Sequence, residues 1–337
     1  MVKLKDIAAR AGVSIMTVSK ALRDAKDISA ETRTRIRKLA EEMRYVPDLS
    51  AQLMRSGKTR LFGLIISAAT NPIYARIVMA LEERAHELGY DLLFAHSLNQ
   101  PSREEACIRR MLTRRVDGLF ITPVYRLTPT AAAYEEIKRL KVPTVILGHR
   151  GLFCSDFANV ETDDIAASFA MTKHLVDLGH KRIAYFTGPT VSPSAQERYE
   201  GYRRALRESN IEMDDRLVFN AGSTIEEGEK AALQMLNENP KATAVQAVND
   251  LVAIGVADVL LNQGVSIPGE ISAAGFGNIL VSEYFRVPLT TVRQPKLRLG
   301  YAAMELMQAL HEGETPQSRR LRAEVIARAS TAAPAQP

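Results

Sequence analysis

Within seven positions, from residue 14 to residue 20, the chain places three hydroxyl side chains, one lysine and two large apolar residues. Hydroxyls can hydrogen-bond to phosphates or base edges, and a lysine can reach an acceptor such as guanine O6 or N7. Apolar side chains beside them can contact a thymine methyl group. The segment therefore has the chemistry needed to contact double-stranded DNA. The candidate contact residues are Ser14, Ile15, Met16, Thr17, Ser19 and Lys20.

Three short helices are predicted to hold this segment. Apolar residues recur at helical spacing over 4–11, from 15 to about 23, and after Ser29. Gly12 accepts the left-handed conformation that ends the first helix, and Ser14 can cap the second. Two helices joined by a glycine-containing turn and braced by a third form a helix-turn-helix, whose second helix fits the major groove. The expected buried residues are Ile7, Ala8, Ala11, Val18, Ala21, Leu22, Ile36, Leu39, Ala40 and Met43.

The charge distribution favours a polyanionic partner for this region. Residues 1–60 contain 14 Lys and Arg against seven Asp and Glu, whereas the remainder contains 30 against 32. The whole positive excess of the chain therefore lies in its first sixth, which suggests that a basic module binds a polyanion while a nearly neutral body does something else. A solvated basic surface and a generic three-helix core are the alternatives. Neither explains why Ile15 and Met16 would face outward beside Lys20.

Four stretches of this region recur in a known order and spacing. They are LKDIAARAGVS, TVSKAL, the run from Ser29 through Tyr45-Val46-Pro47, and SAQLMRSGKTR. Together they strongly resemble the headpiece and hinge of the lactose-repressor/galactose-repressor (LacI/GalR) family of bacterial transcription regulators. The resemblance implies a short hinge helix at about 49–55 that enters the minor groove of DNA. Met54 takes the place of the family's usual wedge leucine, with Leu53 beside it, and methionine is apolar and flexible enough to part a base step.

The implied hinge helix suggests how DNA binding is controlled. About seven residues are too few for a stable isolated helix in water, because helix nucleation is costly. We expect the hinge to fold only when it packs against its symmetry mate on DNA. A change in the separation of the two hinges would then change the affinity for DNA. A plain interdomain linker that ends at residues 56–59 is the alternative.

From Leu61 onward, short apolar runs alternate with helical patterns in two successive series. Continuous apolar strands with helices between them indicate parallel sheets covered on both faces, and two series imply two Rossmann-like lobes. Ligands of such sheets bind beyond the carboxyl ends of the strands, so the cleft between the lobes is the expected site. The predicted strands are LFGLIIS, DLLFAH, DGLFIT, TVILG, RIAYFTG, TAVQAV, ISAAGF and LTTVRQ, and the predicted helices lie near 73–88, 102–114, 129–140, 164–178, 195–209, 226–238 and 250–262.

Short motifs extend the family resemblance to about Ala329. They are NPIY at 71–74, RVDG at 115–118, VETDD at 160–164, GHKRI at 179–183, ERYEG at 197–201, ND at 249–250 and LTTV at 289–292. The resemblance implies an α/β fold in which an all-α helix-turn-helix headpiece precedes two Rossmann-like lobes of the periplasmic-binding-protein type. The implied segments are a headpiece at 1–48, a hinge helix and linker at 49–60, an effector-binding and dimerisation domain at 61–331, and a tail at 332–337. Within that domain the N-lobe takes about 61–160 and 293–320, the C-lobe takes about 161–290 and 321–331, and the chain crosses between them near 159–162, 290–293 and 319–322.

The resemblance also implies a small effector molecule, a sugar or a sugar derivative, in the cleft. Arg198 matches the arginine that grips a sugar hydroxyl or carboxylate with its planar fork of donors. Asp250 matches the acid that accepts hydrogen bonds from ligand hydroxyls or ring nitrogens. The alternatives are that Asp250 only caps its helix and that Arg198 only pairs with a neighbouring acid. The candidate effector-binding residues are Ile73, Tyr74, His149, Ser194, Gln196, Arg198, Ser223 and Asp250.

Two segments depart from the family pattern. Many members have an acidic residue after the fourth strand, where this chain reads LGHR at 147–150, and the common Gly-Phe/Tyr-Asp reads GFGN at 275–278. Both departures remove a carboxylate from the expected cleft and weaken the pattern for neutral sugars. The hypothesis that follows is that His149 or Arg150 favours an anionic or more polar ligand.

Other classes of function find little support in the sequence. It lacks the GxSxG, HExxH and GxxxxGK[ST] motifs of several enzyme classes, and its six histidines and two cysteines lack metal-ligand spacing. We therefore expect no enzyme activity, no metal and no cofactor. A periplasmic-type sugar-binding or transport receptor would explain the body but not the basic headpiece. The N-terminus does not resemble a secretory signal and no apolar run could span a membrane, so the expected location is the cytoplasm.

The family forms dimers through the body, and helix-turn-helix dimers recognise two half-sites related by twofold symmetry. The resemblance therefore implies a homodimer that binds a pseudopalindromic operator, centred on a flexible pyrimidine–purine step. Residues 330–337 are too few and too rich in proline for the heptad helix that makes some relatives tetramers. We expect a ligand-responsive transcriptional regulator that acts as a repressor, with about 1–3 kcal/mol of coupling between effector binding and DNA binding.

Overall fold

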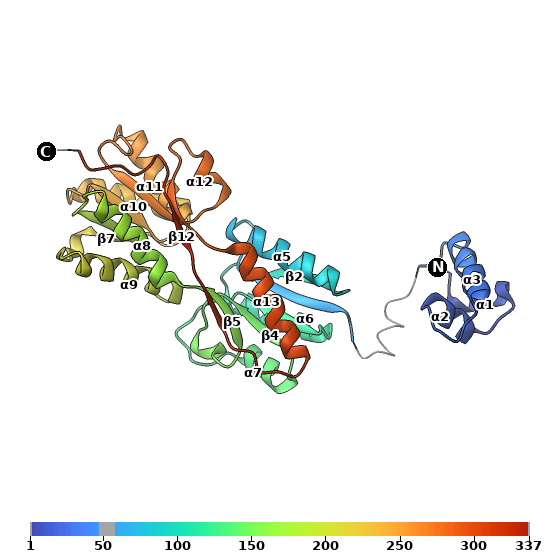
Figure 1. The fold of residues 1–337 in the computed structure, drawn as a ribbon. Coiled ribbons are helices and arrows are strands. Elements are labelled where there is room, and N and C mark those ends of the chain that lie inside the picture. The colour runs from blue at the N-terminus through green and yellow to red at the C-terminus, as the bar shows by residue number, and fades with distance from the viewer. Residues whose placement is uncertain (1, 47–57, 336–337) are drawn as a thin grey trace. The chain divides into compact units, whose positions relative to one another are not determined.

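The computed structural model describes residues 2–46 and 58–335, and the chain divides into two compact units on either side of residue 58 (Figure 1). The first unit contains the helices α1 (Leu4–Ala11), α2 (Ile15–Leu22) and α3 (Ala30–Glu42). As predicted, Gly12 ends α1 in the left-handed region, with a φ of 66°. Ser14 caps α2 by accepting a hydrogen bond from the backbone N–H of Thr17, and Ser29 caps α3 in the same way. The core of this unit contains Ile7, Ala8, Val18, Ala21, Ile36 and Ala40, with Ala11, Leu22, Leu39 and Met43 packed against it.

The second unit begins with an N-lobe built on a six-stranded parallel sheet. Its strands are β1 (Leu61–Ile66), β2 (Asp91–His96), β3 (Gly118–Ile121), β4 (Thr144–Leu147), β5 (Ala158–Thr162) and β11 (Arg319–Leu321), and its helices are α5 (Ile73–Glu87), α6 (Pro101–Thr113), α7 (Ala132–Leu140), the 3-10 turn η1 (Leu152–Cys154) and α13 (Lys296–His311). The strand order is β11-β5-β4-β3-β1-β2. Successive residues of β1 face opposite sides, so Leu64 packs under α5 and α13 whereas Ile65 packs under α6 and α7.

The C-lobe repeats this plan with a second six-stranded sheet. Its strands are β6 (Ile183–Thr187), β7 (Val218–Asn220), β8 (Ala244–Ala247), β9 (Ser272–Gly277), β10 (Thr290–Arg293) and β12 (Glu324–Ile326), and its helices are α8 (Asp164–Asp177), α9 (Pro193–Glu208), the 3-10 turn η2 (Asp215–Leu217), α10 (Ile225–Glu238), α11 (Asp250–Asn262) and α12 (Leu280–Tyr284). The strand order is β12-β10-β9-β8-β6-β7, and only β12 runs antiparallel to its neighbour. Tyr185 packs under α8 and α9, and Phe186 packs under α10 and α11.

The chain passes between the two sheets three times, after β5, after β10 and after β11. Each sheet therefore receives its final strand from the last twenty residues of the described chain. The predicted fold class, a helical headpiece with two Rossmann-like lobes, is confirmed. Across the described residues, no helix combines the length and the apolar character that crossing a bilayer would require.

Helix α13 was not among the predicted helices, although it covers one face of the N-lobe (Figure 1). Gly300 lies in the middle of this helix, where glycine ordinarily weakens a helical pattern. A Cβ atom at Gly300 would lie 2.7 Å from the Cβ of Ala80 and 2.7 Å from the carbonyl oxygen of Ile77. Glycine thus allows α13 to pack closely against α5, and the tertiary contact outweighs the local propensity.

Candidate functional site

The predicted DNA-contact residues lie on or beside α2, and most of them face outward. The side chains of Ile15 and Met16 are 50% and 60% exposed. Ser14 is exposed and Thr17 is half-buried, and their hydroxyl oxygens lie 2.9 Å apart. Ser14 Oγ also accepts from the backbone N–H of Thr17 at 3.0 Å, whereas Thr17 Oγ1 keeps at least one of its two acceptor sites for a further hydrogen bond. This end of α2 therefore offers solvent both polar and apolar groups.

Lys20 carries an ion pair that the sequence pattern did not reveal. Its ammonium group pairs with the carboxylate of Asp27, in the segment between α2 and α3. The hydrogen bond from Lys20 lowers the pKa of Asp27 below its ordinary value. The side chains of Lys20 and Asp27 are 38% and 56% exposed, so water screens the pair, which can be exchanged for a contact with DNA.

Ser19 does not lie on the outer face of α2, and that part of the prediction is wrong. Only 6% of Ser19 is exposed. A helix turns by about 100° per residue, which places Ser19 about 60° from Leu22, on the buried side, and about 100° from Lys20. The two remaining candidates, Leu53 and Met54 of the predicted hinge helix at 49–55, lie outside the described residues.

A cavity of about 230 Å³ lies between the two lobes of the second unit. It is formed by loops at the carboxyl ends of the parallel strands and by the first turns of the helices that follow them, the expected place for a ligand in sheets of this kind. Six of the eight predicted effector residues line it: Ile73, Tyr74, His149, Ser194, Arg198 and Asp250. The lining also includes polar and aromatic residues that were not predicted, among them Asn71, Thr122, Tyr125, Glu161, Thr162, Asp164, Asn249, Phe276 and Gln294.

Gln196 and Ser223 do not line this cavity, so the structure does not support their predicted roles. Gln196 is exposed on α9, and its side-chain amide donates a hydrogen bond of 2.5 Å to the carbonyl oxygen of Thr190. It is two residues from Arg198, and a spacing of two places side chains on different sides of a helix. The backbone N–H of Ser223 donates to Glu227, and its carbonyl accepts from Asn249.

Arg198 is held in one orientation by three different partners. Its Nε donates to Asp164 Oδ1 at 3.1 Å, and its Nη1 donates to the carbonyl oxygen of Val248 at 2.7 Å. The guanidinium carbon lies 3.8 Å from the centre of the Phe276 ring, a cation–π contact. Its Nη2 makes no hydrogen bond with any described residue and so remains as a donor for a ligand. Arg198 thus pairs with a neighbouring acid, as in the alternative interpretation, and also lines the cavity.

Asp250 is buried and already accepts three hydrogen bonds. Oδ1 accepts from Thr291 Oγ1 at 2.5 Å, and Oδ2 accepts from Ser282 Oγ at 2.6 Å and from the backbone N–H of Ile279 at 2.9 Å. Burial raises the pKa of Asp250, and these hydrogen bonds oppose that shift. The cap of α11 is not Asp250 but Asn249, whose side chain accepts from the N–H of Val252. Asp250 therefore fixes the loops around one end of the cavity as well as lining it.

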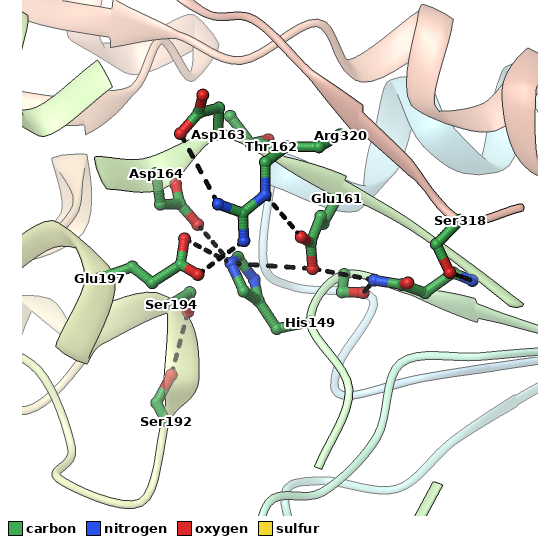
Figure 2. Close-up of polar contacts among 12 residues, drawn as sticks. His149, Glu161, Thr162, Asp163, Asp164, Ser192, Ser194, Glu197, Ser318 and Arg320 are labelled. Carbon is green, nitrogen blue, oxygen red and sulfur yellow. Dashed lines mark hydrogen bonds and ion pairs between the residues drawn. The ribbon is translucent and has the colours of Figure 1, made fainter. Parts of the chain in front are cut away.

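Tyr74, Ile73 and Ser194 complete the predicted part of the cavity. Tyr74, at the start of α5, accepts a hydrogen bond of 3.2 Å from Ser67, and burial raises the pKa of its phenol. Ser194 lies at the start of α9, where its hydroxyl is 3.0 Å from that of Ser192 (Figure 2). The aromatic lining and the hydroxyl groups suit a ligand with both a ring face and polar edges.

His149 lies among carboxylates (Figure 2). Its Nε2 is 3.0 Å from Glu197, 3.6 Å from Asp164 and 3.9 Å from Glu161. Arg150 turns away from the cavity, since its guanidinium donates to the carbonyl oxygens of neighbouring residues. The cleft is therefore rich in carboxylates despite the two sequence departures, and the basis for expecting an anionic ligand is removed.

The cleft contains a group of side chains of the types that bind metal ions. Among the described residues, His149, Asp164 and Glu197 are a group of donor types whose ligand atoms come within 4.8 Å of one another. Arg198 already binds Asp164, and Arg320 donates to Glu197 at 2.7 Å. Because arginines occupy the carboxylates, the group is a set of ion pairs rather than a metal centre.

Comparison with known proteins matches both units of the chain to models of the same protein family. Residues 3–48 match the family model of bacterial regulatory proteins of the lacI family, and residues 59–329 match the model of periplasmic binding proteins and the sugar-binding domain of the LacI family. The chain is 31% identical over 334 residues to the HTH-type transcriptional repressor CytR of Escherichia coli (strain K12), covering 98% of this chain and 96% of CytR. It is 32% identical over 310 residues to the HTH-type transcriptional regulator GalR of Salmonella typhimurium (strain LT2), covering 92% and 90%. It resembles the crystal structure of the lac repressor dimer bound to operator and the anti-inducer ONPF, with a TM-score of 0.89, 27% identity, and coverage of 98% and 99%.

Proposed function

This chain is a member of the LacI family of bacterial regulatory proteins, and we propose that it is a ligand-responsive transcriptional repressor that binds a pseudopalindromic operator as a homodimer. A small carbohydrate-like molecule in the cavity between the lobes controls its affinity for DNA. One observation carries this proposal: a single chain holds both the outward-facing end of α2 and a cavity lined by Arg198, Asp164 and Asp250.

The cavity wall supports a neutral ligand with several hydroxyl groups. Its volume of about 230 Å³ suits a molecule of one or two rings. The carboxylates of Glu161, Asp164 and Asp250 line it together with Arg198 and His149, so an added anion would meet more negative than positive charge. Ligand hydroxyls can donate to the carboxylates and accept from Nη2 of Arg198, and Tyr74 offers a ring face.

Exposed apolar side chains support a dimer formed through the body. The N-lobe exposes Met79 on α5, Phe94 on β2 and Leu98 just after it, and β2 is an edge strand. The C-lobe exposes Leu280, Val281 and Tyr284 on α12. Exposed large apolar side chains of this kind become buried when two protein surfaces associate. One similar structure is, by its own title, a lac repressor dimer bound to operator.

The mechanism we propose links the cavity to DNA through the hinge. A ligand that binds one lobe arrangement better than the other shifts the lobes toward it, and the size of the shift is limited by that difference in affinity. In a dimer this movement would change the separation of the two hinge segments at 49–55, which lie outside the described residues and which we propose to fold as helices only when paired on DNA. The expected coupling is about 1–3 kcal/mol, or roughly 5- to 150-fold in operator affinity.

Selection of bound fragments from a random DNA pool tests the proposal. The full chain should recover a pseudopalindrome, and a panel of neutral sugars, nucleosides and sugar acids should contain a compound that changes the recovery. A variant that lacks residues 1–60 should lose DNA selection and keep ligand binding by calorimetry. Recovery of no preferred sequence under any ligand condition would overturn the regulatory proposal, and binding of sugar acids alone would overturn the neutral ligand.

A further inference from the structure

His149 joins the two lobes through side chains that lie far apart in the sequence (Figure 2). It follows β4 in the N-lobe, whereas Glu197 on α9 and Asp164 on α8 belong to the C-lobe. Nε2 of His149 lies 3.0 Å from Glu197 Oε2 and 3.6 Å from Asp164 Oδ2. Glu161 of the N-lobe, 3.9 Å away, belongs to the same lobe as the imidazole. Many family members have an acidic residue after the fourth strand, whereas this chain has an imidazole that can carry a positive charge.

The cations in this cluster already have carboxylate partners. Arg320 on β11 donates to Glu161 and to Glu197, each at 2.7 Å, and its Nη1 lies 3.9 Å from Asp163 at the exposed edge of the cluster. Arg198 pairs with Asp164. The four carboxylates thus outnumber the two arginines, and a proton on His149 is the further positive charge that the cluster can gain.

The remaining neighbours of His149 bring no further charge to the ring. Tyr125, in the loop after β3, donates its hydroxyl to the backbone carbonyl oxygen of His149 at 2.9 Å, and burial raises the pKa of that phenol well above its usual value. Arg150, the next residue along the chain, donates to the carbonyl oxygens of Ser155 and Phe157. The carboxylates and the arginines therefore dominate the electrostatic environment of the imidazole.

We propose that His149 is a proton-dependent latch between the two lobes. In its protonated form, Nε2 donates to Glu197 and attracts Asp164, which holds α8 and α9 against the loop after β4. In its neutral form the ring loses the charge that attracts these carboxylates, and the closed arrangement is weakened. Closure of the lobes therefore takes up a proton at His149. The latch rests on the proposed function only in requiring that the lobes open and close.

The protonation equilibrium agrees with this geometry. Only 6% of His149 is exposed, and burial lowers the pKa of the imidazole, but the hydrogen bond with Glu197 and the charges of Asp164, Glu161 and Glu197 raise it by more. The pKa of His149 is therefore above its ordinary value in the closed lobes. When the lobes separate, the C-lobe carboxylates leave and the pKa falls. Each unit of difference between the two states changes the closed-to-open ratio by about tenfold across the titration.

A nuclear magnetic resonance titration of the full chain tests the first part of this inference. The six histidine rings are labelled with ¹⁵N, and the signal that disappears in His149→Gln is the one that belongs to the His149 ring. We expect the pKa of His149 to lie above about 6.5, the ordinary value for histidine, and to fall in Glu197→Gln, which removes the acceptor charge and keeps the shape of the side chain. A pKa at or below 6.5 in the unliganded chain would overturn the proposal.

The second measurement follows the distance between the lobes. Spin labels on cysteines placed at Arg139 of α7 and Arg216 of η2, both exposed, report on the separation, while the native Cys107 and Cys154 are buried. Labelled chain is diluted with unlabelled chain, so each labelled protomer reports only on itself. In the wild type, the shorter distance between the two spin labels should predominate at pH 6 and should no longer predominate at pH 8.5.

Matched histidine variants separate the latch from a general effect of pH. His149→Gln should abolish the pH-dependent change in distance, and the exposed His86 of α5, changed to Gln, should preserve it. An equal pH response in His149→Gln and the wild type would overturn the latch. Neither measurement uses DNA or effector, so the latch can fail while selective DNA binding stands, and the reverse outcome is equally visible.

Discussion

The outer face of α2 and the cavity between the lobes hold their side chains in opposite ways. On α2, Ile15 and Met16 face solvent and Lys20 makes one largely exposed ion pair, and all three lie within six positions of the sequence. In the cavity, Arg198 and Asp164 come from different helices, 34 positions apart, and they bind each other in a buried setting.

The difference shows how recognition and stability are shared within one chain. An exposed contact group makes few interactions until its partner arrives, so its removal leaves the core of the headpiece intact. A cavity residue with buried ionic partners also stabilises the fold, because loss of one partner leaves the other charge buried and unpaired. Substitutions in the cavity should therefore alter folding as well as binding, whereas substitutions of the exposed contact residues Ile15, Met16 and Lys20 should alter mainly binding.

Arg198→Ala gives the largest expected effect. It leaves the buried carboxylate of Asp164 without its arginine, and removal of one partner from a buried ion pair costs about 3–5 kcal/mol. Urea unfolding of the full chain should show the body unfolding at a clearly lower denaturant concentration. Arg198→Lys retains the charge and should lose less. An unchanged midpoint for Arg198→Ala would break the contrast between the two regions.

Lys296, at the start of α13, should produce a pH dependence of stability of about 3 kcal/mol over its whole titration. Burial lowers its pKa to about 8, although the charge of Asp250 opposes that shift. The folded chain therefore releases this proton at a lower pH than the unfolded chain does. Between about pH 8 and pH 10 the unfolded chain binds more protons, so the free energy of unfolding should rise with pH.

Chemical unfolding at several pH values checks this expectation, with Lys296→Met as the matched variant. Lys296 donates to the carbonyl oxygens of Gly277 and Asn278, so the variant will be less stable overall. Its stability should nevertheless lack the rise between pH 8 and pH 10. A wild-type chain that loses stability across this range would contradict the sign.

Lys20→Ala should weaken operator binding by about 1–3 kcal/mol and relax base choice at one position, if the ammonium contacts a base. Its effect on headpiece stability should stay below about 1 kcal/mol, because the ion pair with Asp27 is exposed. Fluorescence anisotropy with the selected operator and its single-base variants measures both affinity and base choice. An unchanged operator preference would remove Lys20 from recognition.

Ser14→Ala should lower the stability of the headpiece by about 1 kcal/mol, since it removes the cap of α2. This is the smallest effect, and it sharpens the comparison because Ser14 is an exposed contact candidate that also has a structural role. Thermal unfolding followed by circular dichroism measures it, and Ser29→Ala, which removes the corresponding cap of α3, is the control. Loss of DNA binding without loss of stability would assign Ser14 to recognition instead.

Local patterns predicted much of the fold, because apolar periodicity, helix caps and turn glycines act over a few residues. Ser14, Gly12 and the apolar strands of both lobes are examples. The same patterns did not reveal α13, whose central Gly300 reflects a contact with α5. Nor did they reveal the burial of Ser19. This residue lies at the border of the apolar face of α2, and its burial depends on how the neighbouring helices pack against that border.

The cavity was predictable only in part for a related reason. Arg198 and Asp250 were found through a family motif, and Asp164 lies within another quoted motif, VETDD, without having been assigned a role. His149 was predicted to favour an anionic or more polar ligand, because the sequence did not reveal its contact with Glu197, 48 positions away. Charge pairing across such separations requires the folded arrangement of the two lobes, which no local pattern contains.

The placement of the last two strands affects how this chain is made. Ribosomes synthesise proteins from the N-terminus, and domains generally fold as they emerge. Every residue of α1, α2 and α3 is synthesised before the first body strand. The N-lobe, by contrast, cannot be completed before α13 and β11 are synthesised. The C-lobe cannot be completed before β12, which ends at Ile326. Both lobes of the nascent chain must therefore remain unfinished until β11 and β12 have been synthesised, and these two strands lie within a few residues of each other.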